Sequence, residues 1–305
     1  MLCLRLATPQ MRANNQSAVT SPTLQVLEFP RRTPPSSQLL VPREHGTWGL
    51  WLLPLISGGV VGYWSGPGVA AKPALWFCLA AACAFLIYQP LESLLGFSLL
   101  KIRTQRQQRV AIVWVIGLTA IAAISVLQLV QLHRAMVLLF GLAAAAFFGL
   151  RSLLGRSRRV RIPKQLIGAM GLSSTAAGAY YAMTGKIDRT SLALWLASWL
   201  FAAGQIEYVQ MRLRAAQTRS RRQKARASVD VGFLHLLMLG AAVAGGLAGV
   251  APIWLGVAFI PAVIRLGVWI CRPWQPLSVH ILGFSELFQG LLFNGLLTAA
   301  FLVHF

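Results

Sequence analysis

Apolar stretches long enough to cross a membrane recur along this chain and occupy most of it. Such a span needs about 20 mostly apolar residues, because a helix rises about 1.5 Å per residue and the hydrocarbon core is about 30 Å thick. Only 11% of the 305 residues are charged, against roughly 25% in a soluble domain. We therefore expect an all-α, polytopic membrane protein. The nine expected spans are residues 47–66, 73–99, 110–131, 135–150, 164–184, 190–211, 229–249, 251–271 and 278–303.

The basic residues fall mainly on one side of these expected spans. With the N-terminus inside, 23 of the 28 Lys and Arg residues lie in the N-terminal segment and the even-numbered connections, and four lie on the opposite side. Cytoplasmic segments carry an excess of Lys and Arg. The sequence therefore predicts a multi-pass integral membrane protein, for which we expect the bacterial inner membrane, with a cytoplasmic N-terminus and an outside C-terminus.

Residues 1–40 differ in composition from residues 41–305. They are rich in Pro, Ser, Thr and Arg, and Glu28 is their only acid. Segments of this kind cannot bury enough apolar surface to fold. We expect a disordered tail at residues 1–40 and a transmembrane helical domain at residues 41–305. The alternative for the first segment is an organelle transit peptide, because such peptides are also poor in acids and rich in Arg and Ser.

The transmembrane part contains a weak internal repeat. Val41-Pro42-Arg43 precedes the first expected span, and Ile162-Pro163-Lys164 precedes the fifth. In each half, the next span contains Gln and Glu residues just before a basic connection: Gln89 and Glu92 in the first half, and Gln205, Glu207 and Gln210 in the second. This order predicts two four-helix repeats followed by a ninth helix, an arrangement that often places a binding site between the halves.

Acidic residues inside a bilayer are costly and mark candidate functional sites. Glu92, Glu207 and Glu286 lie one to two turns inside the cytoplasmic ends of their expected spans. We expect them to line a cytoplasm-facing polar cavity. The other candidate ligand-binding residues are Gln89, Gln210, Arg265, Glu44 and His45. The alternative is that each acid pairs with a neighbouring Arg at the interface, where long side chains reach water.

Two segments carry a resemblance to a known family. Pro42-Arg43-Glu44-His45-Gly46-Thr47-Trp48-Gly49 runs into Trp51-Leu52-Leu53-Pro54-Leu55 and resembles the signature of the YwiC-like integral membrane proteins. Gly283-Phe284-Ser285-Glu286 is similar to the closing pattern of the same family. The resemblance spans about residues 40 to 305 and implies a membrane location without implying a chemical activity.

The order of spans also resembles that of the UbiA-type prenyltransferases, which carry two Asp-rich motifs on the inner side. The corresponding places here hold Gln89-Pro90-Leu91-Glu92 and the segment from Gln205 to Gln210, with one Glu each. A Mg²⁺-diphosphate site needs several convergent oxygen ligands. Either adjacent Arg residues hold an anionic group directly, which a guanidinium does well, or the transfer chemistry has been lost.

Three functions follow as alternatives. The first is lipid binding in the cytoplasm-facing cavity, the second is a divergent UbiA-like transferase acting on an isoprenoid or other lipid, and the third is a small-anion transporter. The expected partners are membrane lipids, with anionic headgroups at the basic loops; nucleic acid is not expected. No complete catalytic motif and no close pair of metal-binding Cys residues appears in the sequence. We expect no cofactor, except Mg²⁺ under the transferase alternative.

Overall fold

The computed structural model describes residues 40, 45–65, 71–97, 102–154, 161–273 and 276–304, apart from the side chains of His45 and Arg161. These residues form α-helices and contain no strand. The helices are α2 (His45–Ser65), α3 (Ala71–Leu94), α4 (Gln105–Gln131), α5 (Val137–Leu153), α6 (Arg161–Ser173), α7 (Thr175–Thr184), α8 (Arg189–Arg214), α9 (Arg221–Ala227), α10 (Val229–Leu247), α11 (Leu255–Cys271) and α12 (Val279–Leu302). The expectation of an all-α protein is confirmed.

The helices follow the expected spans closely, with two differences. The fifth span, 164–184, was expected as one helix but is divided between α6 and α7 at Ser174. The short helix α9 lies in a basic connection where no element was expected. Among the described helices, α3, α4, α8, α10 and α12 are long and apolar enough to cross a membrane, and α5 and α11 are shorter apolar helices.

The division of the fifth span has a local cause in its side chains. Ser174 Oγ donates to the carbonyl of Gly171, and Thr175 Oγ1 donates to the carbonyls of Leu172 and Trp51. Hydroxyl groups thereby satisfy backbone carbonyls near the break, as a non-aqueous environment requires. Trp51 lies one turn before Pro54, which lacks an N–H. The hydroxyl of Thr175 therefore links the break to the turn of α2 that contains proline.

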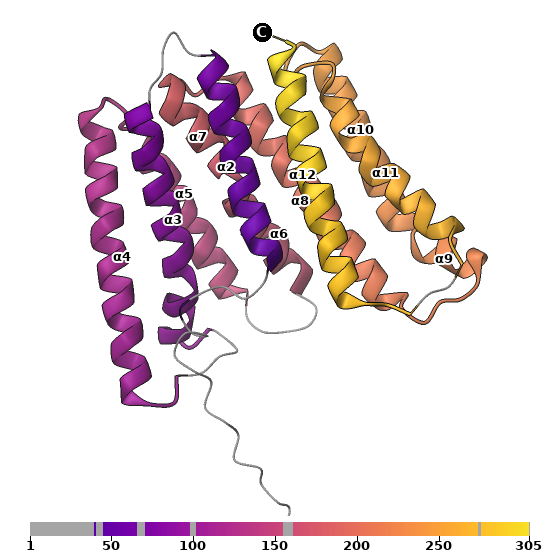
Figure 1. The fold of residues 1–305 in the computed structure, drawn as a ribbon, viewed down its shortest axis with the longest axis horizontal. Helices are drawn as coiled ribbons and strands as arrows, with labels where there is room; N and C mark the ends of the chain where they lie inside the picture. The colour runs from indigo at the N-terminus through magenta and orange to yellow at the C-terminus, as the bar shows by residue number, and fades with distance from the viewer. Residues whose placement is uncertain are drawn as a thin grey trace, which may run out of the picture. The chain divides into compact units, whose positions relative to one another are not determined.

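Helix α2 packs closely on α7 and also contacts α12. Figure 1 shows α2 between the group α3, α4 and α5 and the group α10, α11 and α12. A Cβ atom added to Gly58 would lie 2.0 Å from the carbonyl oxygen of Ala176. Glycine is therefore required at this crossing, because any side chain would collide with the α7 backbone.

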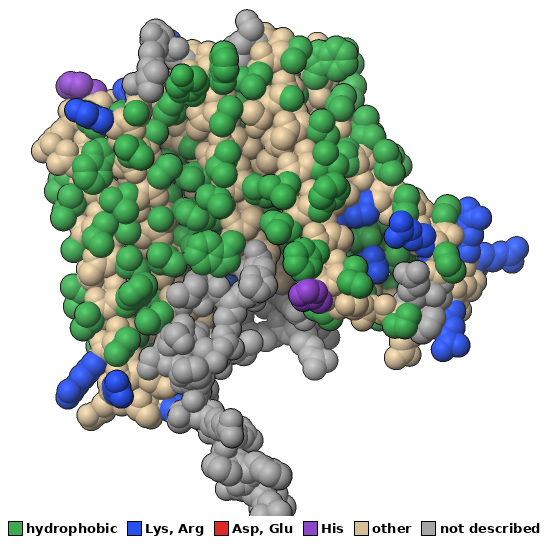
Figure 2. All heavy atoms as spheres, viewed as in Figure 1, with side chains coloured by type: hydrophobic (Ala, Val, Ile, Leu, Met, Phe, Trp, Pro, Cys, Tyr) green, Lys and Arg blue, Asp and Glu red, His purple; other side chains and the backbone are tan. Residues whose placement is uncertain are grey.

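The outward faces of several helices are strongly apolar. Val113, Ile116 and Leu127 of α4 are exposed, and so are Phe233 of α10 and Phe288 of α12. Figure 2 shows hydrophobic side chains spread over the helices of one face, with Lys and Arg gathered around α9. A soluble monomer rarely exposes contiguous apolar surface of this extent. The apolar helices and their exposed faces are those of an integral membrane protein.

Candidate functional site: a basic cavity where α8, α9, α11 and α12 meet

A cavity of about 220 Å³ lies among the ends of α8 and α11, the short helix α9 and the beginning of α12. Four cationic side chains line it: Arg212, Lys224, Arg265 and Arg272. No acidic residue is among the described residues that form its wall. Its volume is below the roughly 300 to 1,000 Å³ of pockets for drug-sized ligands. The cavity therefore suits a small anionic group better than a whole lipid.

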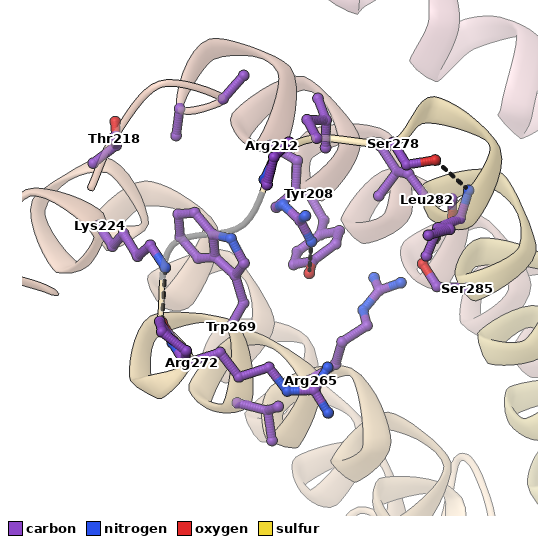
Figure 3. A pocket seen from close by; sticks show the side chains of 17 residues that line it. Tyr208, Arg212, Thr218, Lys224, Arg265, Trp269, Arg272, Ser278, Leu282 and Ser285 are labelled. Carbon is purple, nitrogen blue, oxygen red and sulfur yellow. Dashed lines mark hydrogen bonds between the residues drawn. The ribbon is translucent and has the colours of Figure 1, made fainter. Parts of the chain in front are cut away.

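Aromatic rings hold two of these cations in place. The Cζ atom of Arg212 lies 5.6 Å from the ring centroid of Trp269, and Lys224 Nζ lies 5.5 Å from the centroid of the same ring. Arg212 Nη1 also donates to Tyr208 Oη at 3.0 Å. Figure 3 shows Tyr208, Arg212 and Trp269 close together in the site, with Lys224 and Arg272 on one side and Ser278 and Ser285 on the other. Cation–π contacts of this kind orient the charges without neutralising them.

Lys224 is the most deeply buried of the four cations. Its residue is only 4% exposed, and its ammonium group donates one hydrogen bond, to the carbonyl of Arg272 at 2.9 Å. Burying an ammonium group is expensive unless a counter-charge accompanies it. None of the acids that the structure describes forms an ion pair with Lys224. The Arg272 carbonyl and the Trp269 ring accompany the ammonium group, but no described carboxylate does.

Arg265 belongs to a group that we call the cavity cluster: Tyr208, Arg265 and Glu286. The guanidinium carbon of Arg265 lies 3.8 Å from the Tyr208 ring centroid, and Arg265 Nη1 donates to Glu286 Oε1 at 2.7 Å. Arg265 Nε and Nη2 and Glu286 Oε2 are buried and have no hydrogen-bond partner within the part of the chain that the structure describes. Arg265 is therefore neutralised by Glu286, but its hydrogen-bonding capacity is only partly used.

Part of the cavity wall belongs to the exposed apolar surface of the protein. Val268 of α11 and Ile281 of α12 line the cavity and are 41% and 69% exposed. Both side chains are apolar and lie beside the polar groups Ser278 and Arg272. A bound molecule can therefore contact cations at one end and the apolar surface at the other, as a lipid requires.

A second group with the same chemistry, which we call the closed cluster, consists of Tyr88, Glu92 and Arg151. Tyr88 Oη donates to Glu92 Oε1 at 2.6 Å, Arg151 Nε lies 3.8 Å from the same oxygen, and the Arg151 Cζ atom is 4.7 Å from the Tyr88 ring centroid. A Cβ atom added to Gly168 of α6 would lie 2.6 Å from Arg151 Nη1. Helix α6 thus packs directly against this arginine.

The three glutamates singled out from the sequence have three different arginine partners. Glu92 pairs with Arg151, and Glu286 pairs with Arg265. Glu207 Oε2 lies 3.9 Å from Nη2 of Arg214, whose side chain is largely exposed. These contacts bring Arg265 and Glu286 together, but they do not bring the three glutamates to one place. A common cavity for the three glutamates stays a prediction, as does the alternative that each pairs with its arginine at the membrane interface.

The remaining candidates are not among the residues that line the basic cavity, or lie outside the described residues. Gln210 Nε2 donates to Gln165 Oε1 of α6 at 3.3 Å, and Gln89 is half-buried on α3 beside Pro90. Glu44 and the side chain of His45 lie outside the part of the chain that the structure describes.

Sequence reasoning missed at least four of the residues that form the cavity. Arg212, Lys224 and Arg272 were counted only as basic residues that orient the chain, and Trp269 was not singled out. A usable signal was present, since Tyr208, Arg212, Trp269 and Arg272 place aromatic and basic residues at the same ends of two expected spans. The burial of Lys224 had no such signal, because it depends on how α9 folds back.

Comparison with known proteins supports the resemblance over part of the chain. The family model described as YwiC-like protein matches residues 41–181. No curated protein and no solved structure matches the chain. The expected similarity to YwiC-like proteins is thus confirmed for residues 41–181, which include the closed cluster. The basic cavity lies after the matched residues.

Proposed function

We propose that this membrane protein binds the anionic headgroup of a lipid in the basic cavity. The observation that carries the proposal is a set of three cations, Arg212, Lys224 and Arg272, that form no ion pair with a described acid. They line a cavity whose wall includes the exposed apolar side chains of Val268 and Ile281. A guanidinium group binds a phosphate through paired hydrogen bonds. The apolar wall gives the chains of the same molecule a path to the bilayer.

The orientation in the membrane is part of this proposal. Nine spans, arranged as two repeats and a final helix, would place the N-terminus and the basic cavity on the cytoplasmic side, because 23 basic residues lie on that side and four on the other. Reporter fusions at Gln107, Gly155 and Ser220 should then report inside, and fusions at His133 and Gly185 outside. A fusion at Ser220 that reports outside would contradict the cytoplasmic cavity.

Lipid retention by purified full-length protein tests the function directly. The substitution Arg212→Gln removes one cavity cation, whereas Arg226→Gln removes an exposed cation of α9 that does not line the cavity. We expect Arg212→Gln to reduce co-purified anionic lipid several-fold, because a charged hydrogen bond contributes about 1.5 to 3 kcal/mol. Arg226→Gln should retain lipid at nearly the wild-type level. Equal retention by both variants would assign lipid attraction to the general basic surface and would overturn the proposed site.

Small-anion transport is the second candidate. It is favoured by Gln205 of α8, which is 8% exposed and whose two amide atoms have no hydrogen-bond partner. Gln205 lies in α8 between Phe201 and Tyr208. The Phe201 ring stacks on the Phe293 ring, with 3.9 Å between the ring centroids. Anion flux into vesicles containing the protein, compared with flux into protein-free vesicles, separates transport from binding.

Transfer of a lipid group is the third alternative. In that case the cations of the cavity, with Mg²⁺ if the reaction uses it, would bind the phosphate of the substrate. Analysis of the total lipids of a deletion strain separates the alternatives, because a transferase predicts a missing product, whereas a binding protein leaves the product pool unchanged.

A further inference from the structure

The number of unbalanced charges in the basic cavity indicates what kind of headgroup it takes. Arg265 is neutralised by Glu286, which leaves Arg212, Lys224 and Arg272 without an acidic partner among the described residues. A phosphodiester has a single negative charge, whereas a phosphomonoester has about −1.5 to −2 at pH 7. The larger charge balances the three cations better.

The three cations also reach the cavity from different directions. Arg212 extends from α8, Lys224 from α9, and Arg272 follows the last residue of α11. Figure 3 shows Lys224 and Arg272 on one side of the site and Arg212 next to Tyr208. A phosphomonoester has three terminal oxygens, so each cation can bind an oxygen of its own. A diester has only two such oxygens, and its second substituent would occupy space in a cavity of about 220 Å³.

The first turn of α12 contributes to the same wall. Ser278 caps this helix by accepting a hydrogen bond from the Ile281 N–H, and Ser278, Ile281 and Leu282 all line the cavity. A helix N-terminus carries a partial positive charge of about half an elementary charge. Its effect adds to that of the three cations, which increases the preference for a doubly charged group.

We propose that the natural ligand of the basic cavity is a lipid phosphomonoester, and that the three cations select it over phosphodiester lipids. This inference rests on the proposed function, since it specifies the chemical class of the same lipid. Phosphatidic acid represents the class. Phosphatidylmethanol is its matched control, because it differs only in the methyl group that esterifies one phosphate oxygen.

Equilibrium binding to the full-length protein in detergent tests the selection. At pH 7.5 we expect phosphatidic acid to bind on the order of ten-fold more tightly than phosphatidylmethanol, since an additional charged hydrogen bond contributes about 1.5 kcal/mol. The ratio of the two affinities should fall as the pH is lowered to 5. The second ionisation of a phosphomonoester lies near pH 6, so phosphatidic acid loses its second negative charge over this range. Phosphatidylmethanol does not titrate in this range and should bind equally at both values.

Variants connect the preference to the cations. Arg272→Gln, at an exposed position, should reduce the preference for phosphatidic acid to about three-fold or less, since it removes one of the three charged contacts. Arg226→Gln changes the net charge equally and should leave the preference intact. An unchanged preference in Arg272→Gln would show that these cations do not select the headgroup.

The outcomes separate this inference from the proposed function. Binding of both lipids with equal affinity at pH 7.5 would overturn the selection of a monoester and leave lipid binding standing. Failure to bind either lipid would overturn both. A third arm uses glycerol 3-phosphate as competitor: displacement of phosphatidic acid at comparable concentrations would show that the site takes a soluble phosphomonoester rather than a lipid.

Discussion

The closed cluster and the cavity cluster contain the same three side chains in different surroundings. In both, an arginine lies over a tyrosine ring and pairs with a buried glutamate. In the closed cluster Tyr88 and Glu92 come from adjacent turns of one helix and α6 packs on the arginine. In the cavity cluster the three residues come from α8, α11 and α12, and Arg265 faces a cavity that contains three further cations.

This difference indicates that an ion pair inside a membrane protein is not by itself evidence of a site. Partial burial of Glu92 and Arg151 is explained by the helix packing around them. Both arginines have buried nitrogen atoms without a hydrogen-bond partner among the described residues, Nε in Arg151 and Nε and Nη2 in Arg265. The cavity cluster differs because Arg265 lines a cavity with excess positive charge. We therefore expect substitutions in the closed cluster to change stability without changing lipid binding, and substitutions in the cavity cluster to change lipid binding.

The largest expected effect is on folding, from Arg265→Met. The substitution leaves the Glu286 carboxylate buried without its 2.7 Å partner, so the free energy of unfolding should fall by about 3 kcal/mol. Denaturant unfolding in detergent measures the change. The double variant Arg265→Met with Glu286→Gln should recover part of the loss, because it removes the unpaired charge. A double variant no more stable than Arg265→Met alone would contradict this explanation.

Arg151→Met should have a smaller effect on stability and none on lipid binding. The Arg151 Nε to Glu92 Oε1 distance is 3.8 Å, and the arginine side chain is 27% exposed, so we expect a loss of about 2 kcal/mol in the free energy of unfolding. Retention of phosphatidic acid should match that of the wild type. Loss of lipid at a temperature where the variant is fully folded would mean that the closed cluster also contributes to a binding site.

Glu286→Gln should increase headgroup affinity, and Glu92→Gln should not. Removal of the Glu286 charge leaves Arg265 as a fourth cation available to the anion in the cavity. The expected gain is about five-fold in affinity for phosphatidic acid, which corresponds to about 1 kcal/mol. Equilibrium binding measures both variants side by side. A decrease for Glu286→Gln would indicate that Glu286 orients Arg265 for the ligand and does not compete with it.

The smallest expected effects come from the two tyrosine hydroxyls. Tyr88 Oη donates to Glu92 Oε1 at a part-buried position, so Tyr88→Phe should lower the free energy of unfolding by about 0.5 to 1 kcal/mol. Tyr208 Oη accepts from Arg212, so Tyr208→Phe should weaken phosphatidic acid binding by about two-fold while changing stability little. Measurement of both quantities for both variants gives a two-by-two comparison. If Tyr88→Phe and Tyr208→Phe changed the free energy of unfolding and the affinity for phosphatidic acid in the same way, the distinction between the clusters would be contradicted.

Much of the fold could be predicted from local sequence. The helices fall where apolar stretches of about 20 residues lie between polar connections, since only a helix satisfies its own backbone within a membrane. The exceptions are instructive. The break at Ser174 depends on hydroxyls that satisfy carbonyls, one of them in another helix, and α9 depends on a buried lysine in a strongly basic segment. Hydropathy alone contains neither piece of information.

The sequence by itself determined that the chain is an α-helical membrane protein, that its basic residues favour one side, and that Glu92, Glu207, Glu286 and Arg265 occupy unusual positions for charged residues. Only the tertiary structure decided which arginine each glutamate contacts and which charges face a cavity. The physical reason is that hydropathy and charge bias act residue by residue along the chain. A binding site requires several helices to bring their ends together, and that depends on packing between residues as far apart as Tyr208 and Glu286.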